Sequence, residues 1–150
     1  MNLNSILSPE LTFCRVHGVS KKHLLETSAG LIAGRFPEVD ASQLYAALSA
    51  REQLGSTGLG DGIAIPHCRI PRSQKTIGCL VSLAEPINFD AIDNKAVDLL
   101  FFLLVPDHML ASHLETLRML AEHFSRPEFC ARLRAATTSA ELYAAATSNA

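Results

Sequence analysis

His67 lies at the end of residues 55–67, a segment whose glycines, apolar residues and proline could position a reactive side chain. Four glycines fall within residues 55–62, and glycine permits positive φ angles and close approach of other groups to the backbone. The apolar residues 63–65 favour an extended segment, and Pro66 stiffens the backbone at this point. The sequence therefore predicts an imidazole aimed from a rigid backbone beside a tightly folded loop. The alternative is a histidine without a chemical role, since the chain has six histidines.

Arg51 and His113 are two further candidates, because both positions favour an anion. Arg51 continues the apolar stripe of Leu44 and Leu48 on a predicted helix, and a partly buried guanidinium calls for an anionic partner. That partner is a transient ligand or an ordinary carboxylate such as Asp61, unless the side chain snorkels to solvent. His113 falls in the first turn of a predicted helix, where free amides favour phosphate and the helix dipole favours a neutral imidazole. A half-exposed helix residue without a chemical role is the alternative for His113.

Alternating helices and strands are expected to position these residues. Ser20 and Asp40 are predicted N-caps of two helices that end near Phe36 and Gly55. The almost wholly apolar residues 97–105 are typical of a central strand covered on both faces. The remaining expected elements are strands at 12–17 and 76–84, a helix that a Ser112–Glu115 capping box opens and that buries Leu114, Leu117, Ala121 and Phe124, and short helices at 127–136 and 139–147, the last with Ser139 as its N-cap.

Composition and length indicate a single α/β domain over residues 1–150. The chain is 48% apolar and 19% charged, which is ordinary for a globular protein with a substantial core. The alternation of elements predicts a three-layer sandwich, with a mixed, mainly parallel sheet flanked by helices. A net charge of −2 gives no general attraction to nucleic acid, and the longest apolar run is too short to span a bilayer. The N-terminus lacks the features of a signal peptide, so we expect a cytoplasmic protein without membrane insertion.

Several other site classes are disfavoured by missing motifs. The four cysteines lack CxxC spacing, which predicts reduced thiols rather than a disulfide framework. No ligand-type residues recur at finger-like spacing and HExxH is absent, so no metal site is expected. A nucleotide-binding module is disfavoured because GxxxxGK[ST] and a helix-opening GxGxxG are absent, and a serine hydrolase because GxSxG is absent.

The segment LGSTGLGDGIAIPH, residues 54–67, resembles the signature of the mannitol/fructose-type enzyme IIA domains of the bacterial phosphotransferase system, and most of all their nitrogen-regulatory branch. Ala50, Arg51 and Glu52 precede it in the same pattern. The resemblance continues in order through residues 19–22, 85–93, 97–101, 104–106, 113–114 and 140–143, so it covers nearly the whole chain. It implies a sheet of about five strands and a phosphoryl group carried on the histidine that matches His67.

The resemblance also implies roles around the phosphoryl group. Nε2 of His67 would attack phosphorus, and we predict that a backbone carbonyl holds the other ring nitrogen as N–H. Arg51 would stabilise the phosphoryl charge, and His113 would contact the group without carrying it. The amides of Gly55, Ser56, Thr57 and Gly58 would cradle the phosphoryl oxygens, and Asp61 would orient Arg51 or the histidines. No metal or cofactor is implied.

The function implied by the resemblance is that of a regulatory phosphocarrier with phosphotransferase activity. It would accept phosphate from a histidine-containing phosphocarrier protein of the nitrogen-type system, and its phosphorylation state would regulate partner proteins. The alternative is a sugar-specific IIA component that passes phosphate to a fructose- or mannitol-type IIB protein during uptake. The chain departs from the family at Cys68, where relatives usually have glycine, and we expect a modest sensitivity to oxidation there.

Overall fold

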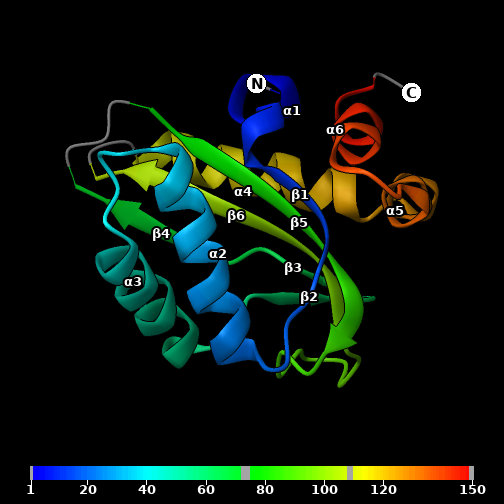
Figure 1. The fold of residues 1–150 in the computed structure, drawn as a ribbon, viewed down its shortest axis with the longest axis horizontal. Coiled ribbons are helices and arrows are strands. Elements are labelled where there is room, and N and C mark those ends of the chain that lie inside the picture. The colour runs from blue at the N-terminus through cyan, green and yellow to red at the C-terminus, as the bar shows by residue number, and fades with distance from the viewer. Residues whose placement is uncertain (1, 72–74, 108–109, 149–150) are drawn as a thin grey trace.

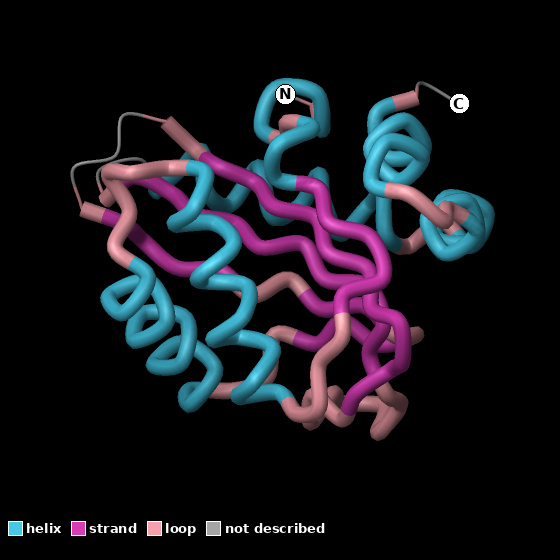
Figure 2. Tube along the Cα trace, viewed as in Figure 1, coloured by secondary structure: helices cyan, strands magenta, loops and turns pink. Residues whose placement is uncertain are grey.

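A six-stranded sheet with helices on both faces forms the body of the structure, a computed structural model that describes residues 2–71, 75–107 and 110–148 (Figures 1 and 2). The helices are α1 (Leu3–Ile6), a 3-10 turn (Pro9–Leu11), α2 (Lys21–Arg35), α3 (Ala41–Leu54), α4 (Leu110–Phe124), α5 (Pro127–Ala135) and α6 (Ser139–Thr147). The strands are β1 (Thr12–Val16), β2 (Gly58–Gly60), β3 (Ile63–Ala64), β4 (His67–Ile70), β5 (Ile77–Ile87) and β6 (Val97–Pro106).

The sheet is mixed and mainly parallel, which confirms the predicted fold class. Its strands follow the order β1-β5-β6-β3-β2, and β4 also pairs with β6. Three pairings are parallel, namely β1 with β5 and both β3 and β4 with β6. The β5–β6 and β2–β3 pairings are antiparallel. The central position of β6 agrees with its almost continuous apolar sequence, since both of its faces are covered.

Strands β3 and β4 are two halves of one interrupted strand. Counted separately, they give the sheet six strands, where about five were expected. Ile63 lies opposite Leu99 and His67 lies opposite Leu103, so the register along β6 is the same in both halves. The interruption falls at Pro66, which has no amide hydrogen to donate but whose carbonyl accepts from the Leu103 amide at 2.9 Å. His67 therefore begins a strand rather than ending one, and the sheet fixes its backbone.

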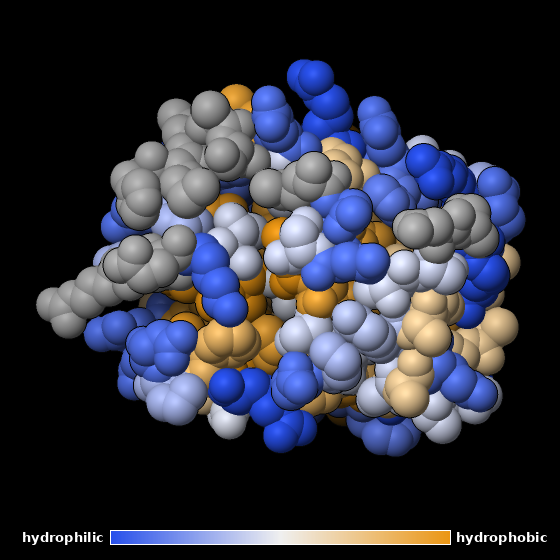
Figure 3. All heavy atoms as spheres, turned by 90° about the horizontal axis from the view of Figure 1, so that it is seen from above, coloured by the Kyte–Doolittle hydropathy of each residue, from blue (hydrophilic) through white to orange (hydrophobic). Residues whose placement is uncertain are grey.

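Two hydrophobic cores lie on opposite faces of the sheet. One packs α2 and α3 against side chains such as Val81, Leu100 and Phe102. The other packs α1, α4, α5 and α6 against alternate strand residues such as Leu99 and Phe101 (Figure 1). Seen from above, the surface carries mostly hydrophilic side chains with hydrophobic residues visible between them (Figure 3). In the described part of the chain, no helix has the length and apolar character needed to cross a membrane.

The two C-terminal capping predictions were wrong in detail. Helix α4 already includes Leu110, so Ser112 lies inside the helix and not at its N-cap. The cap of α6 is Thr138, whose side chain accepts from the Glu141 amide, and not Ser139. The buried face of α4 also differs, because it contains Thr116, Leu120 and Phe124, whereas Leu114 is 63% exposed and Ala121 is exposed. The polar Thr116 hid this face from a reading based on apolar spacing.

Candidate active site

A cavity of about 500 Å³ opens beside β4 and brings three of the predicted site residues together. Its lining comes from α3, β4 and α4, and consists of Ala47, Ala50, Arg51, Leu54, His67, Cys68, Arg69 and His113. Cys68 and Ile70 pack in the core of α2 and α3, so His67 and Arg69, which alternate with them, face the side of α4. Arg51 reaches His67 from α3 and His113 reaches it from α4.

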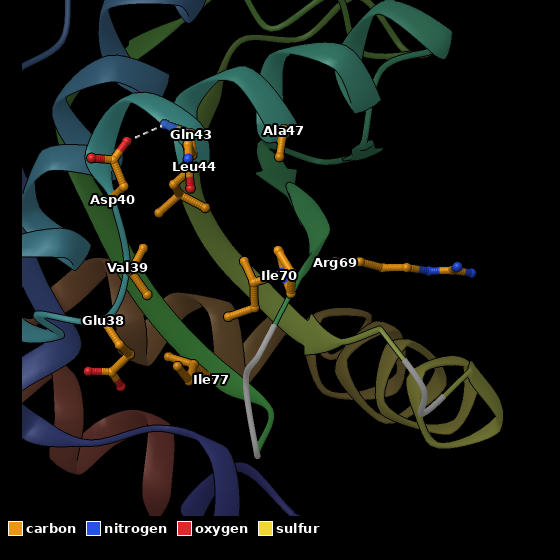
Figure 4. A pocket seen from close by; sticks show the side chains of 10 residues that line it. Glu38, Val39, Asp40, Gln43, Leu44, Ala47, Arg69, Ile70 and Ile77 are labelled. Atoms are coloured by element: carbon orange, nitrogen blue, oxygen red, sulfur yellow. Dashed lines mark hydrogen bonds between the residues drawn. The ribbon is translucent and has the colours of Figure 1, made fainter.

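A second cavity of about 610 Å³ adjoins the first and shares Ala47 and Arg69 with it. In Figure 4 the side chains of Val39, Leu44 and Ile70 converge on this cavity, whereas Arg69 extends away from it. It contains none of the three residues Arg51, His67 and His113. We therefore assign the chemistry to the smaller cavity.

Both nitrogens of the His67 ring have defined partners. Nδ1 lies 2.8 Å from the carbonyl oxygen of Ile65, which calls for a proton on Nδ1. Nε2 lies 3.3 Å from Nε of Arg51, whose N–H donates to it. A neutral ring with its proton on Nδ1 satisfies both contacts, and its one free lone pair, on Nε2, accepts from Arg51 at the cavity. The predicted backbone carbonyl is thus Ile65, within the same extended segment.

Arg51 lies in the last turn of α3 and is held from both ends of its guanidinium. Nε–H donates to His67, and Nη1 donates to the carbonyl oxygen of Gly55 at 2.9 Å. The ion pairs found among the described residues do not involve Arg51. Since its contacts are a neutral imidazole and a carbonyl, the charge of Arg51 remains available to an anion in the cavity.

His113 faces His67 across the cavity from the beginning of α4. The two ring centroids are 5.4 Å apart, and the rings are inclined by 48°. Nδ1 of His113 is buried and has no hydrogen-bond partner within the described parts of the chain. A proton on that nitrogen would be an unsatisfied buried donor, so the arrangement favours the tautomer with the proton on Nε2.

Three of the four loop amides that were expected to cradle phosphate are engaged within the protein, so this expectation needs correction. The amide of Gly55 donates to the Glu52 carbonyl at 3.2 Å, that of Thr57 to Oε1 of Glu52 at 3.1 Å, and that of Gly58 to Oγ of Ser56 at 3.1 Å, while the Ser56 hydroxyl donates to the Phe89 carbonyl at 2.9 Å. None of these four loop residues lines the cavity. The loop is held by hydrogen bonds, mostly to Glu52 and Phe89, and it supports the site from outside the cavity.

Asp61 also lies outside the cavity, so it does not orient Arg51 or the histidines. It occupies the turn after β2 with φ +56°, and its side chain is 85% exposed. Its carboxylate pairs with Lys95 at 3.5 Å, and its amide donates to Asp93 at 2.8 Å. Its carbonyl accepts from Arg134 at 2.7 Å. These contacts assign Asp61 to the turn itself.

Known proteins similar to this chain identify the family. The model of the family described as "Phosphoenolpyruvate-dependent sugar phosphotransferase system, EIIA 2" matches residues 5–148. This chain belongs to the EIIA type 2 family. It is 47% identical over 143 residues to a nitrogen regulatory protein of Pseudomonas aeruginosa, covering 95% of this chain and 93% of that protein. It is 44% identical over 144 residues to the nitrogen regulatory protein of Escherichia coli, covering 95% and 88% of the two chains.

Solved structures of EIIA proteins have the same fold. The nitrogen regulatory protein IIA-Ntr from Neisseria meningitidis superposes with a TM-score of 0.89 at 36% identity, covering 97% of this chain and 99% of that one. The IIA mannitol structure from Escherichia coli superposes with a TM-score of 0.75 at 19% identity, covering 93% and 98%. The second likeness is one of fold alone. As a member of this family, the chain is a phosphotransfer component of the phosphotransferase system.

Two residues near the site of this EIIA domain were missed in the sequence. Arg69 lines the cavity and is two residues from His67 on the same strand face, a spacing that could have revealed it. Glu52 is buried beside Arg51, and its side chain is 4% exposed. Its spacing of four residues from Leu48, and of eight from Leu44, puts an acidic residue on the buried side of α3, and this is the signal that could have drawn attention to it.

Burial sets the charge state of both histidines in the EIIA site. It lowers the pKa of His67 below 6.5, an effect that the Ile65 hydrogen bond opposes and the charge of Arg51 increases. The pKa of His113 is lowered first by burial and then by the charges of His67 and Arg69. Both rings are therefore neutral at pH 7, as a nitrogen nucleophile requires.

We expect the imidazoles of His67 and His113 to titrate below pH 6.5, as measured by NMR of the ring C–H groups. Between the folded and unfolded pKa values the unfolded chain binds more protons. The contribution of these rings to stability is thus complete above pH 6.5 and is lost as the pH falls through their lowered pKa values. A titration midpoint of His67 above 6.5 would contradict the burial argument.

The structure opposes the expected redox sensitivity of Cys68. Its side chain is 8% exposed and packs in the core of α2 and α3, although Cys68 also contributes to the cavity lining. Burial raises the pKa of the Cys68 thiol to about 12, and the thiolate is the reactive form. We expect Cys68 to react with iodoacetamide much more slowly than a free thiol in the folded protein, and mild peroxide to leave phosphotransfer unchanged. Peptide mass spectrometry would measure the modification, with the denatured chain as control.

Proposed function

We propose that this protein is a phosphoryl-carrying regulator. Nε2 of His67 accepts a phosphoryl group from a histidine-containing phosphocarrier protein of the nitrogen-type system, and the phosphorylation state controls contacts with target proteins. The observation that carries the proposal is the convergence of Arg51, His67 and His113 on one cavity, with Nδ1 of His67 held by Ile65. The regulatory part is supported by the nitrogen regulatory proteins at 44–47% identity.

Transfer is an in-line displacement in which the neutral Nε2 of His67 attacks phosphorus. A bond forms from Nε2 to phosphorus as the bond from phosphorus to the donor histidine breaks, and the donor ring keeps that electron pair. The His67 ring becomes more positive during attack, and the hydrogen bond from Nδ1–H to Ile65 strengthens accordingly. No proton has to leave His67 before the new bond forms.

Arg51 and His113 bind the oxygens of the incoming group. Nε–H of Arg51 donates to the Nε2 lone pair in the unphosphorylated protein, and it loses that acceptor when Nε2 bonds to phosphorus. A phosphoryl oxygen then replaces the lone pair as the acceptor, at about the same place. His113, with its proton on Nε2, donates to a second oxygen. The guanidinium charge offsets that of the phosphoryl group.

The proposal is tested by comparing phosphoryl donors and acceptors. The protein is incubated with ³²P-labelled phosphoenolpyruvate, the enzymes that charge the carriers, and either a nitrogen-type or a sugar-type phosphocarrier protein. We expect faster labelling from the nitrogen-type carrier and no onward transfer to a fructose- or mannitol-type IIB protein. Efficient onward transfer to IIB would overturn the regulatory proposal in favour of a sugar-uptake component. The same proposal places the protein in the cytoplasm, where phosphoenolpyruvate is found.

A further inference from the structure

Glu52 places a carboxylate in the interior directly beside the residues of the proposed phosphoryl site. It precedes the glycine-rich loop and follows Arg51, but the two side chains serve different partners. The Glu52 carboxylate accepts from the amide of Thr57 at 3.1 Å through Oε1 and from the Thr57 hydroxyl through Oε2. It also pairs with Nζ of Lys21 at 2.9 Å. Helix α2, helix α3 and the loop are thus joined at a single carboxylate.

Lys21 extends this network to the connection between β5 and β6. Its Nζ donates to the carbonyl oxygen of Phe89 at 3.3 Å and lies 4.5 Å from the centre of the Phe89 ring. The same carbonyl accepts from the Ser56 hydroxyl. Phe89 is fully buried, so the loop is anchored to the interior at Ser56 as well as at Thr57.

A short path leads from this network to the nucleophile. The Gly55 amide donates to the backbone carbonyl of Glu52, and the Gly55 carbonyl accepts from Nη1 of Arg51. Gly55 has φ +154° and lies two residues before Thr57, so its orientation depends on where Thr57 is held. Arg51, fixed in this way at Nη1, presents Nε–H to Nε2 of His67.

We propose that Glu52 is a positioning residue for phosphoryl transfer: by binding Thr57 and Lys21 it holds the Gly55 carbonyl where that carbonyl directs the Arg51 guanidinium at His67. This inference rests on the proposed function. It assigns the loop of residues 55–58 a supporting role in place of phosphate binding.

Stability alone does not account for a carboxylate at this position. A buried ion pair gains little over well-packed apolar side chains, because both charges must leave water. The ion pair instead fixes the positions of its partners, because one carboxylate binds two donors on Thr57 and the ammonium of Lys21 at fixed geometry. A small displacement of a charged group at a phosphoryl site lowers the rate strongly, because positioning and electrostatics dominate this chemistry.

The test is Glu52→Gln, assayed for phosphorylation by the charged phosphocarrier protein well below its unfolding temperature. We expect kcat to fall about 10- to 100-fold with little change in KM for the carrier, because Arg51 loses its alignment and the docking surface is untouched. The double variant Lys21→Met/Glu52→Gln removes both charges and recovers stability lost to an unpaired lysine, but it should keep the low kcat. Leu142→Ala, in the core of α4 to α6, is the control for stability loss at unchanged kcat.

NMR of the His67 ring supplies a second measurement. If Glu52 positions Arg51, Glu52→Gln should weaken the hydrogen bond from Nε of Arg51 and so shift the ¹⁵N resonance of His67 Nε2, whereas a merely structural role would leave it in place. A kcat that recovers together with stability in the double variant, or that falls equally in Leu142→Ala, would overturn the positioning role. If the unsubstituted protein accepts no phosphate, the proposed function fails. If it accepts phosphate and Glu52→Gln reacts at the same rate, only the role of Glu52 fails.

Discussion

Replacing His67 by alanine is expected to abolish phosphoryl acceptance, with a loss of several orders of magnitude in the rate of labelling. The Nε2 lone pair of His67 is the group aligned with Arg51, and His113 is the one other cavity residue with an imidazole ring. His113 does not substitute for it, because the favoured tautomer has its proton on Nε2, and the nitrogen that keeps a lone pair is the buried Nδ1. Incorporation of acid-labile ³²P measures the effect.

The His67 variants should retain the fold. Alanine leaves the Ile65 carbonyl without its imidazole donor, at a cost of about 1 kcal/mol. His67→Asn keeps an N–H near the position of Nδ1 and has no nucleophilic ring nitrogen, so it is the closer match for stability. His123→Ala is the control for loss of a histidine elsewhere, since the His123 ring also bonds to a backbone carbonyl. Acid-labile label persisting in His67→Ala would refute the assignment of the nucleophile.

Arg51→Ala is expected to slow phosphoryl acceptance roughly 10²- to 10³-fold, the usual effect of losing one donor to a developing charge. Arg51→Lys should restore little of this rate, because an ammonium cannot bind the Gly55 carbonyl and the phosphoryl oxygen with one planar group. Single-turnover transfer from the charged carrier measures both variants, and Arg118→Ala, an exposed arginine on α4, is the control. Removing Arg51 should also raise the pKa of His67, because its charge contributes to lowering it. Transfer at the unsubstituted rate in Arg51→Ala would remove Arg51 from the mechanism.

Much of the fold follows from local signals that the tertiary structure does not override. Ser20 and Asp40 cap α2 and α3, as their side-chain hydrogen bonds to the third following amide confirm. The apolar residues of β6 predicted its burial on both faces. The sequence predicted that Pro66 stiffens the backbone. It did not predict that β4 continues the register of β3 along β6, because register depends on the neighbouring strand.

The side chains of the site were predicted better than the loop around it. Arg51, His67 and His113 have charged or titratable side chains at partly buried positions, where such side chains need a specific partner. The structure brings them together in one cavity. Which groups the loop amides bind is decided by side chains that close on them from elsewhere, Glu52 above all. Asp61 was misassigned for the same reason, because Arg134 from α5 reaches its carbonyl across 73 residues of sequence.

The central claim is that Nε2 of His67 is the atom that carries phosphorus, and ¹⁵N NMR of the phosphorylated protein tests it most directly. Ring nitrogens are labelled with ¹⁵N, the protein is phosphorylated by its carrier, and coupling to ³¹P identifies the bonded nitrogen. We predict coupling to Nε2 of His67, with the proton retained on Nδ1 by the Ile65 carbonyl. Phosphorus bonded to Nδ1 of His67, or to either nitrogen of His113, would contradict the mechanism derived from this geometry.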